Sequence, residues 1–209
     1  MLRFGPAWRF VHAWGVAYGS GMATFDLIAT AAFGLEAVVR RELEAGGYEA
    51  KVAQPGRVVF RGDERAVVRA NLWLRASDRV LLQVGQFEAA DFDALFESTK
   101  DLPWEQWIAP DAAFPVSGRS IKSQLSSVPA CQRAVKKAVV ERLMSAHGVS
   151  ELPETGATYG IEISLLDNVA TLTIDTAGSR SLTGQDAQAI DIDVGLAAEL
   201  REEVAARLQ

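Results

Sequence analysis

The chain has 209 residues, 49% of them hydrophobic and 23% charged, and it carries a net charge of −6. This is the composition of an ordinary globular protein with room for one large or two small domains. Its single cysteine, Cys131, excludes an internal disulfide framework and favours a reducing compartment, so we expect a cytoplasmic protein. His12 and His147 are the only histidines, which excludes a histidine-rich metal site, and no apolar run is long enough to span a membrane.

Residues 1–21 differ from the rest of the chain and are predicted to be a disordered leader. They contain Arg3 and Arg9, several aromatic residues and no acidic residue. His12 and Gly15 interrupt the apolar stretch that a secretory signal peptide needs, so we do not expect export. Met22 comes just before the first well-patterned strand and is a candidate for the natural start.

Residues 22–90 show strand and helix patterns in the order β-α-β-β-α-β, which predicts a ferredoxin-like subdomain. In chain order, the patterns are a strand at 25–32, a helix at 34–47, two strands within 49–62 around a Pro55-Gly56 turn, a helix at 64–76 and a strand at 78–89. Asp63 is placed to cap the second helix.

The first of these helices is predicted to be amphipathic. Glu36 and Arg40 lie one turn apart on the side that we expect to face solvent. The opposite face is predicted to pack against the sheet, and it consists of Leu35, Val38, Val39 and Leu43.

A second unit is predicted over residues 91–178, so the chain is expected to be an α+β protein. Its patterns are a helix within 91–108 that Pro103 interrupts, a strand within 112–123, a helix from Val128 to His147, and strands at 158–166 and 169–177 joined by an Asp167-Asn168 turn. Residues 179–209 form a divergent tail in which a short helix is predicted at 195–208.

The sequence contains no motif that predicts catalysis. GxGxxG, P-loop, GxSxG, CxxC and HExxH patterns are all absent. Cys131 lies in the long predicted helix and is expected to be a small core residue. The carboxylates at Asp91 and Asp93, or at Asp191 and Asp193, have a spacing that is common on solvated loops. We therefore predict no catalytic, metal-binding or cofactor-binding residue in this chain.

Positive charge is concentrated in one segment of this acidic chain. Between Phe114 and Arg142 there are six basic residues and one acidic residue, so this segment carries +5 and the rest of the chain carries −11. The basic residues are Arg119, Lys122, Arg133, Lys136, Lys137 and Arg142. A local cluster of this kind is typical of a site for a polyanion, although surface helices of soluble proteins also carry lysines.

The long helix separates its apolar and basic residues. Arg133, Lys136 and Lys137 fall within an arc of about 100°. The other side is predicted to be buried and holds Cys131, Ala134, Val135, Ala138, Val139 and Leu143. Arg142 falls among the apolar residues, so we expect it to extend to solvent or to pair with a buried carboxylate.

The stretch before the helix is serine-rich and basic. If it is extended, Arg119, Ile121 and Ser123 point to one side and Ser120 and Lys122 to the other. Hydroxyl groups, cations and a helix start are all good ligands for phosphate. From the residues alone, a solvated surface and a polyanion site remain nearly equal interpretations.

Several runs of the chain resemble a known family. They are "FDLIATAAFGLEAVVRRELEAGGYEA", "LWLRASDRVLLQVGQFEAADFDALFESTKDLPWEQWI", "FPVSGRSIKSQLSSVPACQRAVKKAVVERL" and "TYGIEISLLDNVATLTIDTAG". From about Ala23 to Gly178, the chain resembles the N-terminal region of bacterial large-subunit ribosomal RNA guanine-N2 methyltransferases. The resemblance implies a ferredoxin-like subdomain at 22–90 and a THUMP domain, an RNA-docking module, at 91–178.

The resemblance also implies a partner and a set of contacts. The expected partner is structured RNA, most specifically large-subunit ribosomal RNA. The resemblance implies RNA binding for Arg119, Ser120, Lys122, Ser123, Lys136 and Lys137, and the basic face of the helix adds Arg133.

The sequence departs from the family pattern after Gly178. The family continues into a Rossmann-like domain with cofactor glycines and an Asn-Pro-Pro-Tyr-type motif, and neither feature is present here. The resemblance therefore implies a docking module for a methyltransferase that uses S-adenosylmethionine, with no cofactor bound by this chain and no activity of the chain alone. Two alternatives stay open: a truncated, frame-shifted or separate subunit that is active only with a separate catalytic domain, and a ferredoxin-like small-molecule sensor.

Overall fold

The structure of the protein is a computed structural model that describes residues 24–177. The predicted leader and the predicted tail helix lie outside these residues. The described elements are β1 (Phe25–Ala31), α1 (Glu36–Ala45), β2 (Ala50–Gln54), β3 (Arg57–Gly62), α2 (Glu64–Trp73), β4 (Ser77–Glu88), α3 (Phe92–Lys100), η1 (Trp104–Gln106), β5 (Val116–Ile121), α4 (Val128–His147), β6 (Ile161–Leu166) and β7 (Val169–Asp175). This order confirms the predicted α+β class and the predicted succession of strands and helices.

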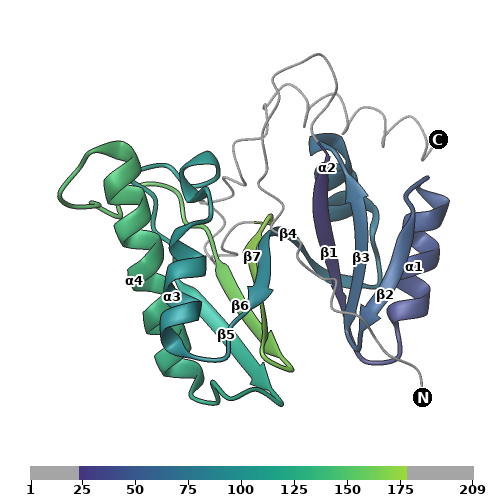
Figure 1. The fold of residues 1–209 in the computed structure, drawn as a ribbon. Helices are drawn as coiled ribbons and strands as arrows, with labels where there is room; N and C mark the ends of the chain where they lie inside the picture. The colour runs from purple at the N-terminus through teal and green to yellow at the C-terminus, as the bar shows by residue number, and fades with distance from the viewer. Residues whose placement is uncertain (1–23, 178–209) are drawn as a thin grey trace.

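The strands form one seven-stranded sheet in the order β2-β3-β1-β4-β7-β6-β5 (Figure 1). Over its first four strands, neighbours are antiparallel and β1 lies between β3 and β4. This is the ferredoxin-like arrangement that the sequence predicts. The Asp63 carboxylate accepts a hydrogen bond from the Ala66 backbone N–H at 2.9 Å, which confirms the predicted cap of α2.

The predicted apolar face of α1 is only partly buried. Val39 and Leu43 are buried, but Leu35 and Val38 are 41% and 39% exposed. Leu35 precedes the first residue of the helix, and Val38 is rotated about 100° away from Val39, so both side chains are left partly exposed to solvent. The prediction was therefore wrong for these two residues.

Glu36 does not pair with Arg40. The Glu36 carboxylate accepts hydrogen bonds from the backbone N–H groups of Gly34 at 2.9 Å and Gly56 at 2.7 Å, and so joins two neighbouring turns. Arg40 lies instead 3.6 Å from the Glu44 carboxylate. Backbone N–H groups that no strand or helix uses compete successfully with an exposed cation for this carboxylate.

Strand β4 joins the two halves of the sheet. Its first part pairs with β1, and the stretch from Leu81 to Glu88 pairs with β7. Beyond β7, β6 runs antiparallel and β5 runs parallel to β6, with α4 as the connection between β5 and β6. Asp167 and Asn168 have φ angles of 50° and 65°, which fits the predicted tight turn between β6 and β7.

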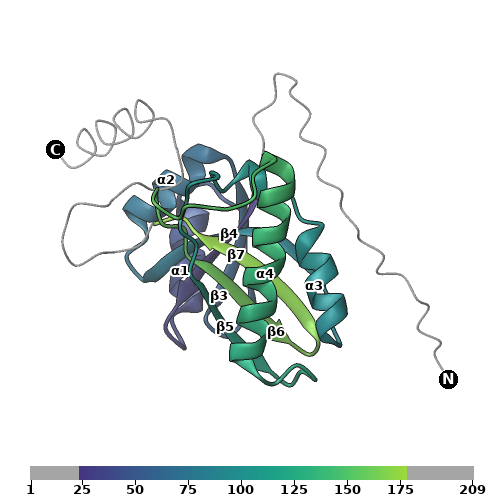
Figure 2. The same cartoon turned by 90° about the vertical axis from the view of Figure 1, so that its left-hand side faces the viewer.

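The helices lie on the outer sides of the two halves. Figure 1 shows α1 on one side and α3 and α4 on the other, with the strands between them, and Figure 2 shows α4 lying across β5 and β6. Each half has a core of its own between its helices and its strands. One face of the sheet is therefore covered by helices, and we call the other side the helix-free face.

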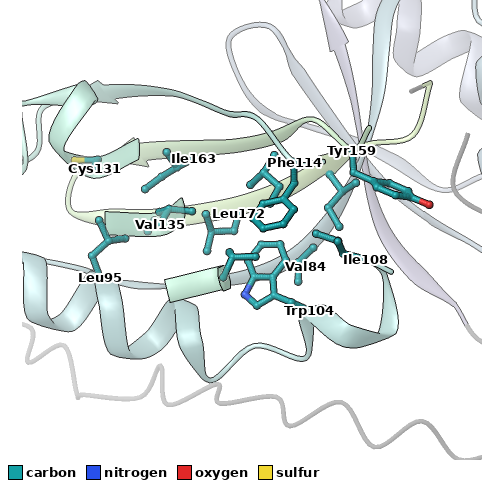
Figure 3. Packing of buried hydrophobic residues seen from close by; sticks show 14 of the residues in the cluster. Val84, Leu95, Trp104, Ile108, Phe114, Cys131, Val135, Tyr159, Ile163 and Leu172 are labelled. Atoms are coloured by element: carbon teal, nitrogen blue, oxygen red, sulfur yellow. The ribbon is translucent and has the colours of Figure 1, made fainter. Parts of the chain in front are cut away.

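The second core is built around large aromatic side chains. Trp104 and Phe114 are buried, and Figure 3 shows them in one cluster with Val135 of α4 and Leu172 of β7. Cys131 belongs to this cluster and is 1% exposed, which confirms its predicted role in the core. Burial raises the pKa of its thiol, which favours the uncharged form.

Candidate nucleic-acid interface

The structure places Arg119 on the helix-free face, away from the helix α4 that carries Arg133, Lys136 and Lys137. A Cβ added to its neighbour Gly118 would lie 2.7 Å from Ile163 Cγ2 and 3.5 Å from Gln132 Cγ of α4, so Gly118 faces α4. Side chains alternate along a strand, and Arg119 therefore points to the opposite face. There its Nε donates a hydrogen bond to Ser164 Oγ at 2.9 Å.

The two predicted serines hold the loop that follows β5. Ser120 Oγ donates to the Leu125 carbonyl at 2.7 Å. Ser123 Oγ donates to the Ile121 carbonyl at 3.0 Å and accepts from the Asn168 backbone N–H at 3.0 Å. These contacts set the path of residues 122–127 between β5 and α4. Lys122 stands in this loop with its side chain exposed and a φ of 50°.

The apolar side of α4 is buried as predicted except at Ala134, which is partly buried. The three cations of the helix have different surroundings. Lys136 Nζ lies 2.5 Å from Glu154 Oε1, 3.2 Å from the Phe114 carbonyl oxygen and 3.6 Å from the centre of the Phe114 ring. Lys137 is 71% exposed and lies 3.7 Å from the Glu141 carboxylate. Arg133 is exposed and, within residues 24–177, has no acidic partner.

Arg142 pairs with an acid, as one of the two predicted alternatives proposed. Its Nε and Nη2 donate to the two carboxylate oxygens of Glu105 at 2.9 and 2.6 Å. The Glu105 side chain is 27% exposed, so this pair is largely shielded from water. The hydrogen bond from Arg142 lowers the pKa of Glu105, because it stabilises the charged carboxylate.

Charge counted along the chain overstates the charge that the segment presents in space. Four of its six cations are paired with carboxylates: Arg119 with Glu162, Lys136 with Glu154, Lys137 with Glu141 and Arg142 with Glu105. Three of these carboxylates, all except Glu141, lie outside the segment. Among the described residues, Lys122 and Arg133 are the two cations of the segment that keep an unshared charge. They lie on the β5–α4 connection and on the second turn of α4.

Sequence reasoning missed one charged group on the helix-free face. Arg57 of β3 is 3% exposed, and its Nη2 contacts the Glu162 carboxylate of β6. Arg119 Nε lies 3.9 Å from the same carboxylate. Burial lowers the pKa of Arg119, the charge of Arg57 lowers it further, and Glu162 opposes both effects. Two guanidinium groups therefore share one carboxylate.

The part of the surface that the structure describes includes two small hollows. One of about 150 Å³ lies beside Asn71, Arg79 and Asp175, and one of about 250 Å³ lies between α1 and α2. Both are below the 300 Å³ or so at which pockets for small molecules begin. Within residues 24–177, no group of His, Cys, Asp and Glu side chains is arranged to hold a metal ion. None of the helices described in that range is both long and apolar enough to cross a membrane.

Comparisons with known proteins agree with this fold. Residues 26–81 match the model of the RlmL ferredoxin-like domain, and residues 89–175 match that of the THUMP domain. The chain therefore belongs to the proteins in which an RlmL-type ferredoxin-like domain is followed by a THUMP domain.

Two relatives with assigned names are similar to this chain. The chain is 48% identical over 189 residues to "Putative RNA methyltransferase YpsC" of Bacillus subtilis, an alignment that covers 90% of this chain and 48% of the relative. It is 30% identical over 125 residues to "Ribosomal RNA large subunit methyltransferase K/L" of Methylococcus capsulatus, covering 60% of this chain and 17% of the relative. The chain thus spans about half the length of the first relative and less of the second.

A solved structure shows the same fold at high identity. The crystal structure of SMU.472, a putative methyltransferase complexed with SAH, superposes with a TM-score of 0.71 at 43% identity. The superposition covers 74% of this chain and 42% of that one. The shared part again corresponds to less than half of the longer protein.

Proposed function

We propose that this chain docks structured large-subunit ribosomal RNA for a guanine-N2 methyltransferase, and that a catalytic domain separate from residues 24–177 transfers the methyl group. The THUMP domain at residues 89–175 is the observation that carries this proposal. The names of the two relatives support RNA, and ribosomal RNA in particular, as the partner. The apolar residues of both halves are buried in their cores, so the surface available for docking RNA is largely charged. Neither of the hollows described above is large enough to suggest a small-molecule ligand instead.

The two halves have different roles in this proposal. The ferredoxin-like subdomain, 22–90, orients the THUMP domain, 91–178, through the shared strand β4. The cations Arg119, Lys122, Arg133, Lys136 and Lys137 supply contacts to RNA phosphates, and Ser120 and Ser123 hold the loop that carries Lys122. Lys122 and Arg133 contribute most among those on the α4 side, because no carboxylate in residues 24–177 neutralises them.

S-adenosylmethionine is the methyl donor in this proposal, and the separate catalytic domain binds it. SMU.472 was solved with SAH, the demethylated product of that donor, which supports this cofactor for the relatives. Calorimetry of this chain with S-adenosylmethionine should give no binding heat. A stoichiometric binding isotherm would contradict the assignment of the cofactor to another domain.

The docking role is tested by titrating a structured fragment of large-subunit ribosomal RNA at several salt concentrations. Affinity should fall steeply with salt, because each phosphate contact releases counterions. A double variant, Lys122→Gln with Arg133→Gln, should weaken binding and reduce the slope of log affinity against log salt by about 1 to 2. Arg40→Gln with Arg41→Gln is the matched control, because it removes two exposed charges from α1. Equal losses in both variants would contradict a specific role for the β5–α4 surface.

A further inference from the structure

The contact between Arg57 and Glu162 shows that the sheet is strongly curled. Three strands, β1, β4 and β7, separate β3 from β6 in the sheet order. In a flat sheet, β3 and β6 would be about 19 Å apart, since neighbouring strands are about 4.8 Å apart. The two side chains nevertheless touch on the helix-free face. The curl therefore brings residues of both halves together at one place that none of the described helices covers.

The charges at this place do not balance. Arg57 and Arg119 each carry a full positive charge, and Glu162 supplies the single carboxylate that both contact. Nearby acids of the same face do not compensate, because each already has its own arginine: Asp26 pairs with Arg61, and Asp175 pairs with Arg79. The cluster formed by Arg57, Arg119 and Glu162 thus keeps one excess positive charge.

Hydrogen-bond donors in the cluster are also left without acceptors. Within residues 24–177, the Nε and Nη1 atoms of Arg57 are buried and have no hydrogen-bond partner, although buried guanidinium groups are normally satisfied. Arg119 uses only its Nε, for Ser164 and Glu162, so its two Nη atoms make no hydrogen bond within residues 24–177. Arg119 is 37% exposed and Glu162 is 27% exposed, so the cluster is open to solvent on the Arg119 side.

We propose that Arg57 and Arg119 form a site for an RNA backbone phosphate on the helix-free face of the curled sheet. This rests on the proposed docking function and names a second contact surface for it, separate from α4. A phosphate oxygen accepts from the planar fork of Arg119, and the buried charge of Arg57 strengthens that contact. Glu162 competes with the phosphate for both guanidinium groups. Removing the Glu162 charge should therefore strengthen RNA binding.

The test compares two variants with opposite expected effects. Arg119→Gln should weaken binding of the structured RNA about tenfold and lower the salt slope by about 1, because one phosphate contact is lost. Glu162→Gln should strengthen binding several-fold and steepen the salt slope, although it removes the partner of a buried arginine. Arg119→Lys keeps the charge without the planar fork and should fall between the wild type and Arg119→Gln.

Glu49→Gln is the matched control for Glu162→Gln, because it removes one exposed negative charge from the α1–β2 connection, away from the proposed RNA contacts. Thermal unfolding of each variant shows that it is folded at the assay temperature. Tighter binding from Glu162→Gln and not from Glu49→Gln supports the site on the helix-free face. If the wild type binds RNA while Arg119→Gln and Glu162→Gln leave affinity unchanged, the cluster only holds the two halves together. That result would contradict the proposed phosphate site. If the wild type does not bind RNA at all, the docking function itself fails.

Discussion

The guanidinium of Arg142 and the carboxylate of Glu105 form a two-point ion pair between α4 and the short helix η1, with N···O distances of 2.9 and 2.6 Å. The two groups come from elements that pack around the same core, and both are mostly shielded from solvent. Such a planar pairing is among the stronger contacts that side chains make. It fixes the outer helix that carries Arg133, Lys136 and Lys137.

Replacing Glu105 by Gln should lower the free energy of unfolding by about 1 to 2 kcal/mol at pH 7, because Arg142 loses a charged acceptor in a partly buried place. Arg142 holds the pKa of Glu105 below its usual value, so this stabilisation is complete above the pKa of the unfolded carboxyl group. It is lost as the pH falls through the lower, folded-state pKa. Urea unfolding of both proteins from pH 7 to pH 3 should show the difference shrinking in acid. A difference that stays constant with pH would contradict the ion pair.

Replacing Gly118 by Ala should destabilise the protein by about 1 to 3 kcal/mol. The new methyl group would lie 2.7 Å from Ile163 Cγ2 and 3.2 Å from the Ile163 carbonyl oxygen, and Ile163 is fully buried. Gly160→Ala is the matched control, because its methyl group would meet only Asp175 Cβ at an ordinary 3.5 Å. Denaturant midpoints measure both effects. Equal midpoints for the two variants would show that Ile163 is not packed closely against Gly118.

Cys131 should react slowly with alkylating reagents in the native protein. Its side chain is 1% exposed, and burial raises the pKa of its thiol, so little reactive thiolate is accessible. Because it is the only cysteine, mass spectrometry of iodoacetamide-treated protein reports on this one site. We expect the rate to rise at least about a hundredfold in urea, since reaction requires opening of the core. Similar rates in both conditions would place Cys131 at the surface.

Arg133→Glu should weaken RNA binding more than Lys136→Gln does. Arg133 is exposed without an acidic partner in residues 24–177, whereas the Lys136 ammonium is already held by Glu154, the Phe114 carbonyl and the Phe114 ring. A phosphate would have to compete with these partners, so its contact with Lys136 contributes less binding free energy. Filter binding or fluorescence anisotropy with one structured RNA measures both variants. The reverse order of effects would show that RNA displaces Glu154 from Lys136.

The elements of this fold could be predicted because their signals are local. The bounds of the helix from Val128 to His147, the Asp63 cap and the Asp167-Asn168 turn each depend on a few adjacent residues. The wrong predictions concern the exposure of Leu35 and Val38. Burial depends on which direction a helix faces in three dimensions, and a periodic pattern fixes that direction only to within about one residue.

The arrangement of charge could not be predicted in the same way. Arg57 and Glu162 are 105 residues apart in the sequence, and nothing near either residue indicates their contact. The acids that pair with Arg119, Lys136 and Arg142 likewise lie outside the basic segment. The charge counted along the chain identifies the basic segment. Only the fold shows that, within residues 24–177, no carboxylate pairs with Lys122 or Arg133.

The proposed RNA-docking role can be tested by equilibrium binding of this chain to a structured fragment of large-subunit ribosomal RNA. Duplex DNA of equal length serves as the competitor. We expect saturable binding that weakens with rising salt and that excess DNA displaces poorly, because a THUMP domain would recognise folded RNA. Absence of binding at low salt, or equal competition by DNA, would contradict this role.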